Sequence, residues 1–214
     1  MKRVNIGCGP TPTPGWVNFD NSLSVRLARY PLVVAGLSRL GLLAEGQQKL
    51  IFAARHGDIR WADATRRIPL PDASAEILYS SHMLEHLDRE SAKVFLSEVQ
   101  RVLVPNGIVR IVVPDLKKLV AEYRVDGDAN AFIDRSLLTR PRPAKLLDKL
   151  KYLVVGDRHH QWMYDGESLT RLVVAAGFKE PRVLPAGSTQ IIDPGSLDLW
   201  ERAEVSVYVE AYKK

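Results

Sequence analysis

Two kinds of hydrophobic pattern alternate along the chain. Short apolar runs bounded by glycine, proline or polar turn residues predict buried strands, and longer runs with an apolar residue at every third or fourth position predict amphipathic helices. The predicted strands lie at about 4–6, 15–20, 59–64, 75–80, 108–113, 182–184 and 204–212. This alternation predicts an α/β fold, doubly wound around a mostly parallel seven-stranded sheet with helices on both faces.

The clearest helical pattern follows the fourth predicted strand. Asp88 is a good N-cap for a helix that runs to about Leu103, in which Phe95, Val99 and Val102 share one face. The sequence therefore predicts that this helix packs against the sheet. Further helices are expected at about 114–123, 132–138, 144–153 and 165–176, the last of them ending at Gly177.

Two segments interrupt the alternation and are interpreted as helical insertions in a single domain that spans residues 1–214. The first insertion, 22–56, is expected to form two helices that break near Gly41 or Gly46. It is strongly apolar, and we expect it to cover part of the sheet; a lid or a membrane-surface helix are the alternatives. The second insertion covers about 125–161.

The first strand ends in Gly7-Cys8-Gly9, and the second strand ends on Asp20. A strand that ends in two closely spaced glycines turns sharply and leaves room for a ligand. A carboxylate at the end of the second strand commonly binds ribose hydroxyls. Three prolines within residues 10–14 make a helix there improbable, so no phosphate-binding helix N-terminus follows the loop. These features favour a cofactor with a ribose but no phosphate, such as S-adenosylmethionine.

Composition excludes several classes of protein. The hydrophobic fraction of 46% and the charged fraction of 26% are those of a globular domain and argue against disorder. Cys8 is the only cysteine, so no internal disulfide can form. Neither a signal peptide nor an uncharged run of about 18 residues is apparent, and a cytoplasmic location is expected.

The formal net charge of +5 favours anionic partners, and basic residues concentrate between positions 140 and 160. A solvated helix face is the preferred explanation of such a segment. The basic residues are Arg140, Arg142, Lys145, Lys149, Lys151 and Arg158, followed by His159 and His160.

Taken together, these residues resemble a known family over nearly the whole chain. The similarity is to class I S-adenosylmethionine-dependent methyltransferases of the type 11 group, which have a Rossmann-like fold. The motifs that carry it are Val4-Asn5-Ile6-Gly7-Cys8-Gly9, Asp20, Asp63, Leu70-Pro71-Asp72, Leu84-Glu85-His86-Leu87, Arg101-Val102-Leu103-x-Pro105-x-Gly107 and Ala176-Gly177-Phe178. The run Gly15–Asp20 further resembles small methyltransferases of bacterial polysaccharide and cell-envelope loci.

The resemblance implies a role for each motif around S-adenosylmethionine. The backbone of Gly7, Cys8 and Gly9 would face the methionine moiety, and Asp20 would bind the ribose hydroxyls. Asp63 would bind the adenine amino group, with Ala64 beside the ring. Ser81 and His82 would lie near the sulfonium. The chain departs from the family pattern at Thr11, which replaces the third glycine of the loop.

The reaction implied is transfer of a methyl group to an oxygen, nitrogen or carbon nucleophile of a small-molecule or glycan acceptor. Glu85 and His86 are the candidate general base, because the stretch after the fourth strand borders the methyl group in the family and histidine titrates near neutral pH. Local capping by Glu85 and packing by His86 are the alternative. No metal is expected, and the oligomeric state is left open.

The acceptor is expected to bind in the segment from about Val125 to Asp165, where His160, Trp162 and Tyr164 combine a titratable ring with aromatic faces. This mixture suits an anionic glycan or a nucleotide-linked sugar. Packing of the two aromatic residues against the sheet is the alternative. If these residues do not bind the acceptor, the first insertion is the better candidate.

Three other functions remain open at this point. The spacing His82-x-x-Glu85-His86 matches a zinc-peptidase signature, although it follows a strand directly and lacks a helical setting. An RNA-directed methyltransferase would use the basic segment around Lys145, but no nucleic-acid partner is favoured. A non-catalytic subunit that only binds the cofactor is the third alternative.

Overall fold

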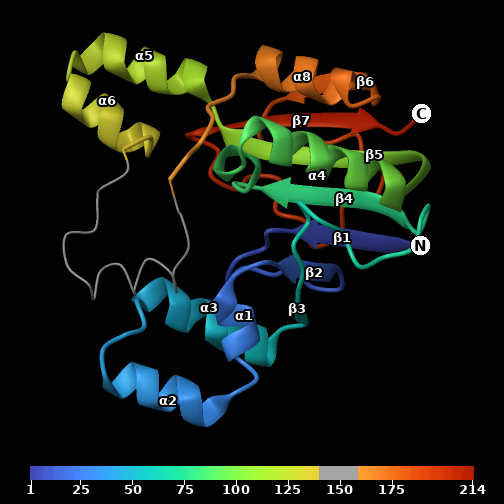
Figure 1. The fold of residues 1–214 in the computed structure, drawn as a ribbon. Helices are drawn as coiled ribbons and strands as arrows, with labels where there is room; N and C mark the ends of the chain where they lie inside the picture. Colours follow the sequence, from blue (N-terminus) through green and yellow to red (C-terminus); the bar gives the residue numbers. More distant parts are fainter. Residues whose placement is uncertain (140–158) are drawn as a thin grey trace.

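The computed structural model describes residues 1–139 and 159–214 (Figure 1). A seven-stranded sheet with the strand order β3-β2-β1-β4-β5-β7-β6 organises the fold. Its strands are β1 (Lys2–Ile6), β2 (Val17–Asp20), β3 (Ile59–Trp61), β4 (Ala75–Ser81), β5 (Leu103–Pro114), β6 (Lys179–Leu184) and β7 (Ser206–Tyr212). Strands β1 to β5 pair in parallel, whereas β7 runs antiparallel to both β5 and β6. The predicted fold class, a mostly parallel seven-stranded α/β sheet, is confirmed.

The helices of the described segments are α1 (Leu23–Leu27), α2 (Pro31–Arg39), α3 (Glu45–His56), α4 (Arg89–Val102), α5 (Leu116–Asp126), α6 (Ala129–Ser136) and α8 (Gly166–Ala175), with a short 3-10 turn η1 (Leu84–His86). The first insertion thus contains three helices, so the prediction of two was wrong. The chain does break at Gly41, but Gly46 lies within α3. The helix expected at 144–153 lies outside the described residues. None of the described helices is long and apolar enough to span a membrane.

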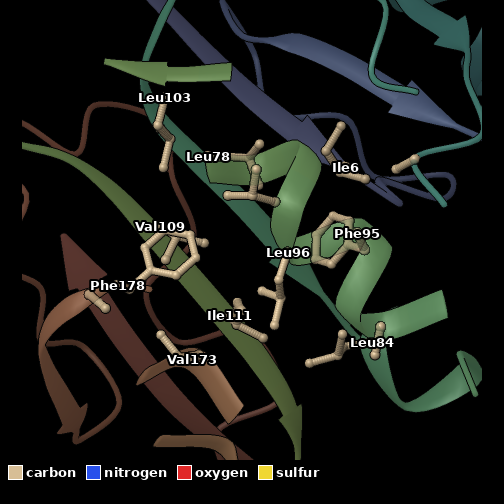
Figure 2. Close-up of a cluster of buried hydrophobic side chains, with 14 of the residues drawn as sticks. Ile6, Leu78, Leu84, Phe95, Leu96, Leu103, Val109, Ile111, Val173 and Phe178 are labelled. Atoms are coloured by element: carbon tan, nitrogen blue, oxygen red, sulfur yellow. The ribbon is translucent and has the colours of Figure 1, made fainter. Parts of the chain in front are cut away.

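One face of the sheet is covered by α4 and α8. Asp88 caps α4 by accepting a hydrogen bond from the backbone N–H of Ser91, as its position predicts. Figure 2 shows Phe95 and Leu96 of α4 near Leu78 of β4, among the side chains of the main core. Phe95 and Leu96 have no exposed surface, so the predicted packing of this helix against the sheet is confirmed.

Along each strand, successive side chains point to opposite faces of the sheet. Leu78 of β4 lies in the main core, and its neighbour Tyr79 lies on the opposite face together with Val112 of β5. Ile191 and Leu197, from the irregular connection between β6 and β7, pack on that face together with Trp16. The first insertion instead packs on β3 and on the glycine loop, where Val25, Leu50 and Ile59 surround Cys8. Residues 22–56 therefore cover the sheet only at β3, and residues 185–205 cover this central face.

Two buried asparagines fix the proline-rich loop that follows β1. The side-chain amide of Asn5 donates to Oγ1 of Thr13 at 3.0 Å, and Oδ1 of Asn18 accepts from the Thr13 backbone N–H at 2.8 Å. The Asn18 amide also donates to the carbonyls of Thr13 and Trp16. The loop thus reaches β2 without a helix, as the three prolines predict.

Candidate functional site

The cofactor residues predicted from the sequence follow four neighbouring strands and meet at one edge of the sheet. Gly7 follows β1, Asp20 ends β2, Asp63 follows β3, and Ser81 ends β4. The strands are parallel and in register at this edge, since Ile6 pairs with both Phe19 and Ser80. This edge is the one at which open α/β sheets bind their ligands.

Asp20 joins the glycine loop to the start of the first insertion. One carboxylate oxygen accepts a hydrogen bond from the Gly9 backbone N–H at 3.0 Å, and the other accepts from the Ser22 N–H at 2.8 Å. The side chain is buried, and burial raises the pKa of Asp20 while the two N–H donors oppose this rise. A carboxylate offers about four lone-pair sites, so acceptor capacity remains for the hydroxyls of a ribose.

Gly7 and Gly9 of the glycine loop both have a positive φ, a backbone conformation that residues with side chains rarely adopt. Gly7 has φ +73°, and a Cβ there would lie only 2.7 Å from Cγ of Met83. Gly9 has φ +52° and open space where a Cβ would stand. Cys8 points away into the apolar cluster with Val25, and burial raises the pKa of its thiol, which keeps it protonated. The loop therefore presents backbone rather than a reactive side chain.

Asp63 and Ala64 stand just after β3. Oδ1 of Asp63 accepts from the backbone N–H of Thr65 at 3.0 Å and from its hydroxyl at 2.6 Å, and Oδ2 pairs with the exposed Arg66 at 3.3 Å. The Asp63 side chain is a quarter exposed, whereas Ala64 is buried. Asp63 is thus held in a turn with its carboxylate partly open to solvent.

His82 follows β4 in a strained conformation. Its φ of +48° lies in the left-handed region, which is uncommon for a residue with a side chain and is seen often at functional sites. Its backbone N–H donates to the Val112 carbonyl at 2.9 Å, and Nε2 lies 2.8 Å from Oγ of Ser206. These two contacts hold the ring near the ends of β4, β5 and β7. Ser81, just before it, is buried.

Glu85 is buried among three histidines. Its Oε1 lies 3.4 Å from Nδ1 of His82, 3.9 Å from Nε2 of His86 and 3.9 Å from Nε2 of His160. Its side chain is only 1% exposed, and neither carboxylate oxygen has a hydrogen-bond partner among the described residues. Burial lowers the pKa of His160, and the nearby Glu85 charge opposes this effect. The structure therefore brings together four residues that the sequence assigned to three different tasks.

A cavity of about 260 Å³ opens beside this cluster. Its walls come from the end of β5, one face of α5, α6, and the segments around His160 and Val205. The lining residues are His82, Pro114, Asp115, Lys118, Leu119, Glu122, Arg135, Leu137, His160, Met163, Arg202 and Val205. Sequence reasoning missed the contribution of α5, although Asp115, Leu119 and Glu122 have the spacing of one helix face.

The three residues predicted to bind the acceptor do not share one cavity. His160 lines the cavity, whereas Trp162 lies in another groove, with its ring 4.8 Å from the guanidinium of Arg89. Tyr164 has no exposed surface and belongs to the main core. Tyr164 thus packs in the interior, which agrees with the alternative of packing against the sheet.

The chain has detectable similarity to known proteins at two levels. Residues 23–111 match the family model of a methyltransferase domain. No curated protein matches the sequence. This family match starts at α1 and ends within β5, so it includes Asp63, Ser81, His82 and Glu85.

Solved structures of S-adenosylmethionine-dependent methyltransferases share the fold over the whole chain. The protein from Methanosarcina mazei has a TM-score of 0.53 at 15% identity, with 99% of this chain and 92% of that one covered. The protein from Thermotoga maritima has a TM-score of 0.52 at 16% identity and coverages of 100% and 82%. The protein from Mesorhizobium loti has a TM-score of 0.51 at 16% identity and coverages of 99% and 90%.

The family match and the fold confirm the resemblance to S-adenosylmethionine-dependent methyltransferases of class I, type 11. S-adenosylmethionine is the cofactor that they imply. The residues present fit this group, because Asp20 retains acceptor capacity at the strand edge and Gly9 leaves open space beside it. The chain thus combines the fold of these methyltransferases with polar groups, at the carboxyl ends of its parallel strands, that suit this cofactor.

Proposed function

We propose that this chain transfers the methyl group of S-adenosylmethionine to a nucleophilic atom of a small or glycan-type acceptor. In the reaction the bond between the methyl carbon and sulfur breaks and its electron pair stays on sulfur, while an oxygen, nitrogen or carbon of the acceptor bonds to the methyl carbon. A proton on the nucleophile passes to a base. Most of the rate gain in such a reaction comes from alignment of the two partners.

The position of His82 supports this proposal most strongly. This residue follows β4 at the edge assigned to the cofactor, and its side chain also lines the 260 Å³ cavity. An acceptor in the cavity would therefore lie next to the part of the edge where the resemblance puts the sulfonium. A reactive methyl group and a bound nucleophile need this adjacency, because in-line transfer requires close contact.

The charges of the cavity favour an acceptor with an anionic group. Lys118 donates to the carbonyls of Ala203 and Ser206, so its ammonium also fixes the cavity wall. Arg135 pairs with Glu122 and Asp126. Arg202 is exposed at the cavity and offers a guanidinium suited to a phosphate or carboxylate. Leu119 and Met163 supply apolar surface for a sugar ring or a small aliphatic group.

Glu85 and His86 remain the proposed base for an acceptor that carries a proton. Neither lines the cavity, but His160 does, and its Nε2 faces Glu85. Burial lowers the pKa of His160, which favours the neutral form of its ring. In this scheme Glu85 and His86 take up the proton, and His160 lies between Glu85 and an acceptor in the cavity.

The first prediction concerns cofactor binding, and calorimetry with S-adenosylmethionine and S-adenosylhomocysteine tests it. Wild type should bind both, and Asp20→Ala should weaken binding at least roughly tenfold because a buried carboxylate that meets the ribose is lost. Asp58→Ala is a matched control, since Asp58 is exposed and pairs only with Arg60 in the described part of the chain. Absence of binding to wild type would refute the proposal.

A screen with labelled cofactor then tests the acceptor class. Sugar phosphates, nucleotide-linked sugars, small acids, lipids and RNA should be compared, and we expect label on an anionic sugar. The rate with that acceptor should fall in Arg202→Ala, whereas cofactor affinity should not change. Transfer to RNA alone would favour the RNA-directed alternative, for which the basic segment 140–158 lies outside the described residues. Cofactor binding without transfer to any class would favour a non-catalytic subunit.

A further inference from the structure

Glu85, His86 and His160 bring three metal-ligand atoms within 4.8 Å of one another. Glu85 and His86 belong to η1, and His160 comes from the segment after the second insertion, far away in sequence. We propose that this cluster binds a divalent transition-metal ion, with Zn²⁺ as the best match. The metal-binding proposal stands on the geometry of the cluster and does not depend on the acceptor proposed above.

The Glu85 carboxylate is buried without a hydrogen bond from the described part of the chain. Neither of its oxygens has a hydrogen-bond partner among the described residues, although the side chain is only 1% exposed. A buried carboxylate without a partner costs several kcal/mol, so most such groups are paired or coordinate a metal. Its shortest contact with the three histidines is 3.4 Å, with Nδ1 of His82, and its contacts of 3.9 Å with His86 and His160 are too long for hydrogen bonds.

The distances between the ligand atoms suit a bound ion better than direct hydrogen bonds between the side chains. Zinc binds carboxylate oxygen and imidazole nitrogen at about 2.0–2.2 Å in tetrahedral geometry, which separates neighbouring ligand atoms by roughly 3.3 Å. The separations of 3.9 Å from Glu85 to His86 and to His160 exceed this value by about 0.6 Å, a change that small side-chain rotations can supply. The ligand atoms of His86 and His160 lie within 4.8 Å of each other, so binding an ion would also draw these two rings together.

The surroundings of the cluster orient its ligand atoms. Nδ1 of His86 lies 3.2 Å from the carbonyl of His159, so this nitrogen carries the proton and Nε2 keeps its lone pair toward Glu85. The Glu85 carbonyl accepts hydrogen bonds from the backbone N–H groups of Gln161 and Trp162, which ties the two segments together. A backbone carbonyl that fixes the tautomer of a ligating histidine is a common feature of metal sites.

The donor set selects the type of ion. Two imidazole nitrogens and one carboxylate oxygen suit zinc and its first-row neighbours, whereas magnesium and calcium prefer oxygen ligands alone. His160 also lines the cavity, so a fourth position facing the cavity is available to water or to the acceptor. An acceptor hydroxyl bound there would lose its proton more readily, and this consequence alone rests on the proposed function.

The proposed site differs from the zinc-peptidase signature seen in the sequence. That signature uses the two histidines of His82-x-x-Glu85-His86 on one helix, with the glutamate beside them. Here Leu84–His86 forms only a 3-10 turn, and Nε2 of His82 is engaged by Ser206. His82 is not a member of the group whose ligand atoms converge, and His160 takes its place.

The second prediction is that the full chain, stripped with a chelator, binds one Zn²⁺ per molecule. Titration calorimetry and elemental analysis after dialysis would measure this, and Co²⁺ should give the visible absorption of a site with nitrogen ligands. Glu85→Gln, His86→Ala and His160→Ala should each weaken Zn²⁺ binding more than tenfold. His56→Ala is the matched control, because His56 is exposed and contacts only Phe52 among the described residues.

Binding of S-adenosylhomocysteine to each variant separates loss of the metal site from loss of the fold. Because His86 is 30% exposed, His86→Ala should keep both the fold and cofactor binding even if Glu85→Gln does not. The proposal is overturned if wild type binds no Zn²⁺, or if His86→Ala and His160→Ala bind it as tightly as His56→Ala does. Either result leaves the cofactor-binding prediction untouched, since calorimetry with S-adenosylhomocysteine measures that separately.

Discussion

At the scale of single residues, Arg110 and Glu210 form the most buried ion pair among the described residues. The two face each other across β5 and β7, are both fully buried, and are joined by a hydrogen bond of 2.6 Å. Arg110 also donates to the Ser188 carbonyl, and Glu210 accepts from Thr189 and Gln190. The pair thus anchors the connection 185–205 to the sheet.

The third prediction is that Glu210→Gln lowers the free energy of unfolding by about 3–5 kcal/mol, because it leaves the Arg110 charge buried and uncompensated. Urea unfolding followed by circular dichroism would measure the change. Glu167→Gln is the matched control: it breaks an exposed pair with Arg171, and its cost should stay below about 1 kcal/mol. Equal effects of the two substitutions would contradict the prediction.

Residues whose role depends on local sequence could be predicted, and residues whose role depends on long-range contacts could not. Asp20 and Gly7 follow apolar strands, so their place at the sheet edge was predictable from the strands alone. The surroundings of Glu85 were not, because His160 is brought to it by the fold across 75 residues, the difference between positions 160 and 85. No periodic pattern records such a contact.

At the scale of elements, Arg101 joins the end of α4 to the loop at residues 68–72. It lies in the last turn of α4, and its guanidinium donates to the carbonyls of Ile68 and Leu70 and to the carboxylate of Asp72. Glu98, one turn earlier, binds Arg101 and also accepts from the Ile68 N–H at 2.8 Å. The helix end thereby holds the loop that leads into β4.

The fourth prediction concerns the pH dependence of this contact. The Arg101 hydrogen bond holds the pKa of Glu98 below its ordinary value of 4.5, although partial burial opposes it. The stabilisation is therefore complete above pH 4.5 and is lost as the pH falls through the lowered pKa. Glu98→Gln should cost about 1–3 kcal/mol at pH 7 and less in acid.

Chemical denaturation of wild type and Glu98→Gln between pH 3 and pH 7 would test this, with Glu90→Gln as the control on the same helix. Glu90 is exposed and pairs only with Lys93 among the described residues, so its substitution should give a small difference in stability. A cost of Glu98→Gln that stays constant over this range would show that the carboxylate charge is not what stabilises the loop.

Helices whose N-terminus is marked by a capping residue were predicted well, whereas the shortest helix was not. Helix α4 begins after Asp88 and α8 begins after Asp165, as their capping residues indicate. The first insertion was predicted with one break too few, because α1 has only five residues and shows no period of its own. Pro31 at the first turn of α2 was the signal that could have revealed the extra break.

At the scale of the whole molecule, the two faces of the sheet are covered by different kinds of structure. Helices α4 and α8 cover one face, and their apolar periodicity predicted this. The connection 185–205 covers the other with Ile191 and Leu197, although it has no helical or strand period. An irregular segment that packs through a few scattered apolar side chains resembles a surface loop in sequence, so its role could not be predicted.

The last prediction decides whether this connection is part of the cooperative core. Its ties to the sheet include the Arg110 contact with Ser188, the Glu210 contact with Gln190 and a short hydrogen bond from Tyr79 to Glu201. With these ties the segment should not open alone. Leu197→Ala should therefore lower the global free energy of unfolding by about 2–5 kcal/mol, like a core substitution.

Urea unfolding measured by circular dichroism should shift together with the tryptophan fluorescence, because Trp16 packs on the same face as Leu197. Ile192→Ala is the matched control, since the neighbouring Ile192 is fully exposed and its substitution should have almost no effect. If Leu197→Ala changes the fluorescence transition but leaves the circular dichroism transition in place, the connection opens as a separate unit. In that event the second face of the sheet would be covered by a segment that folds after the core.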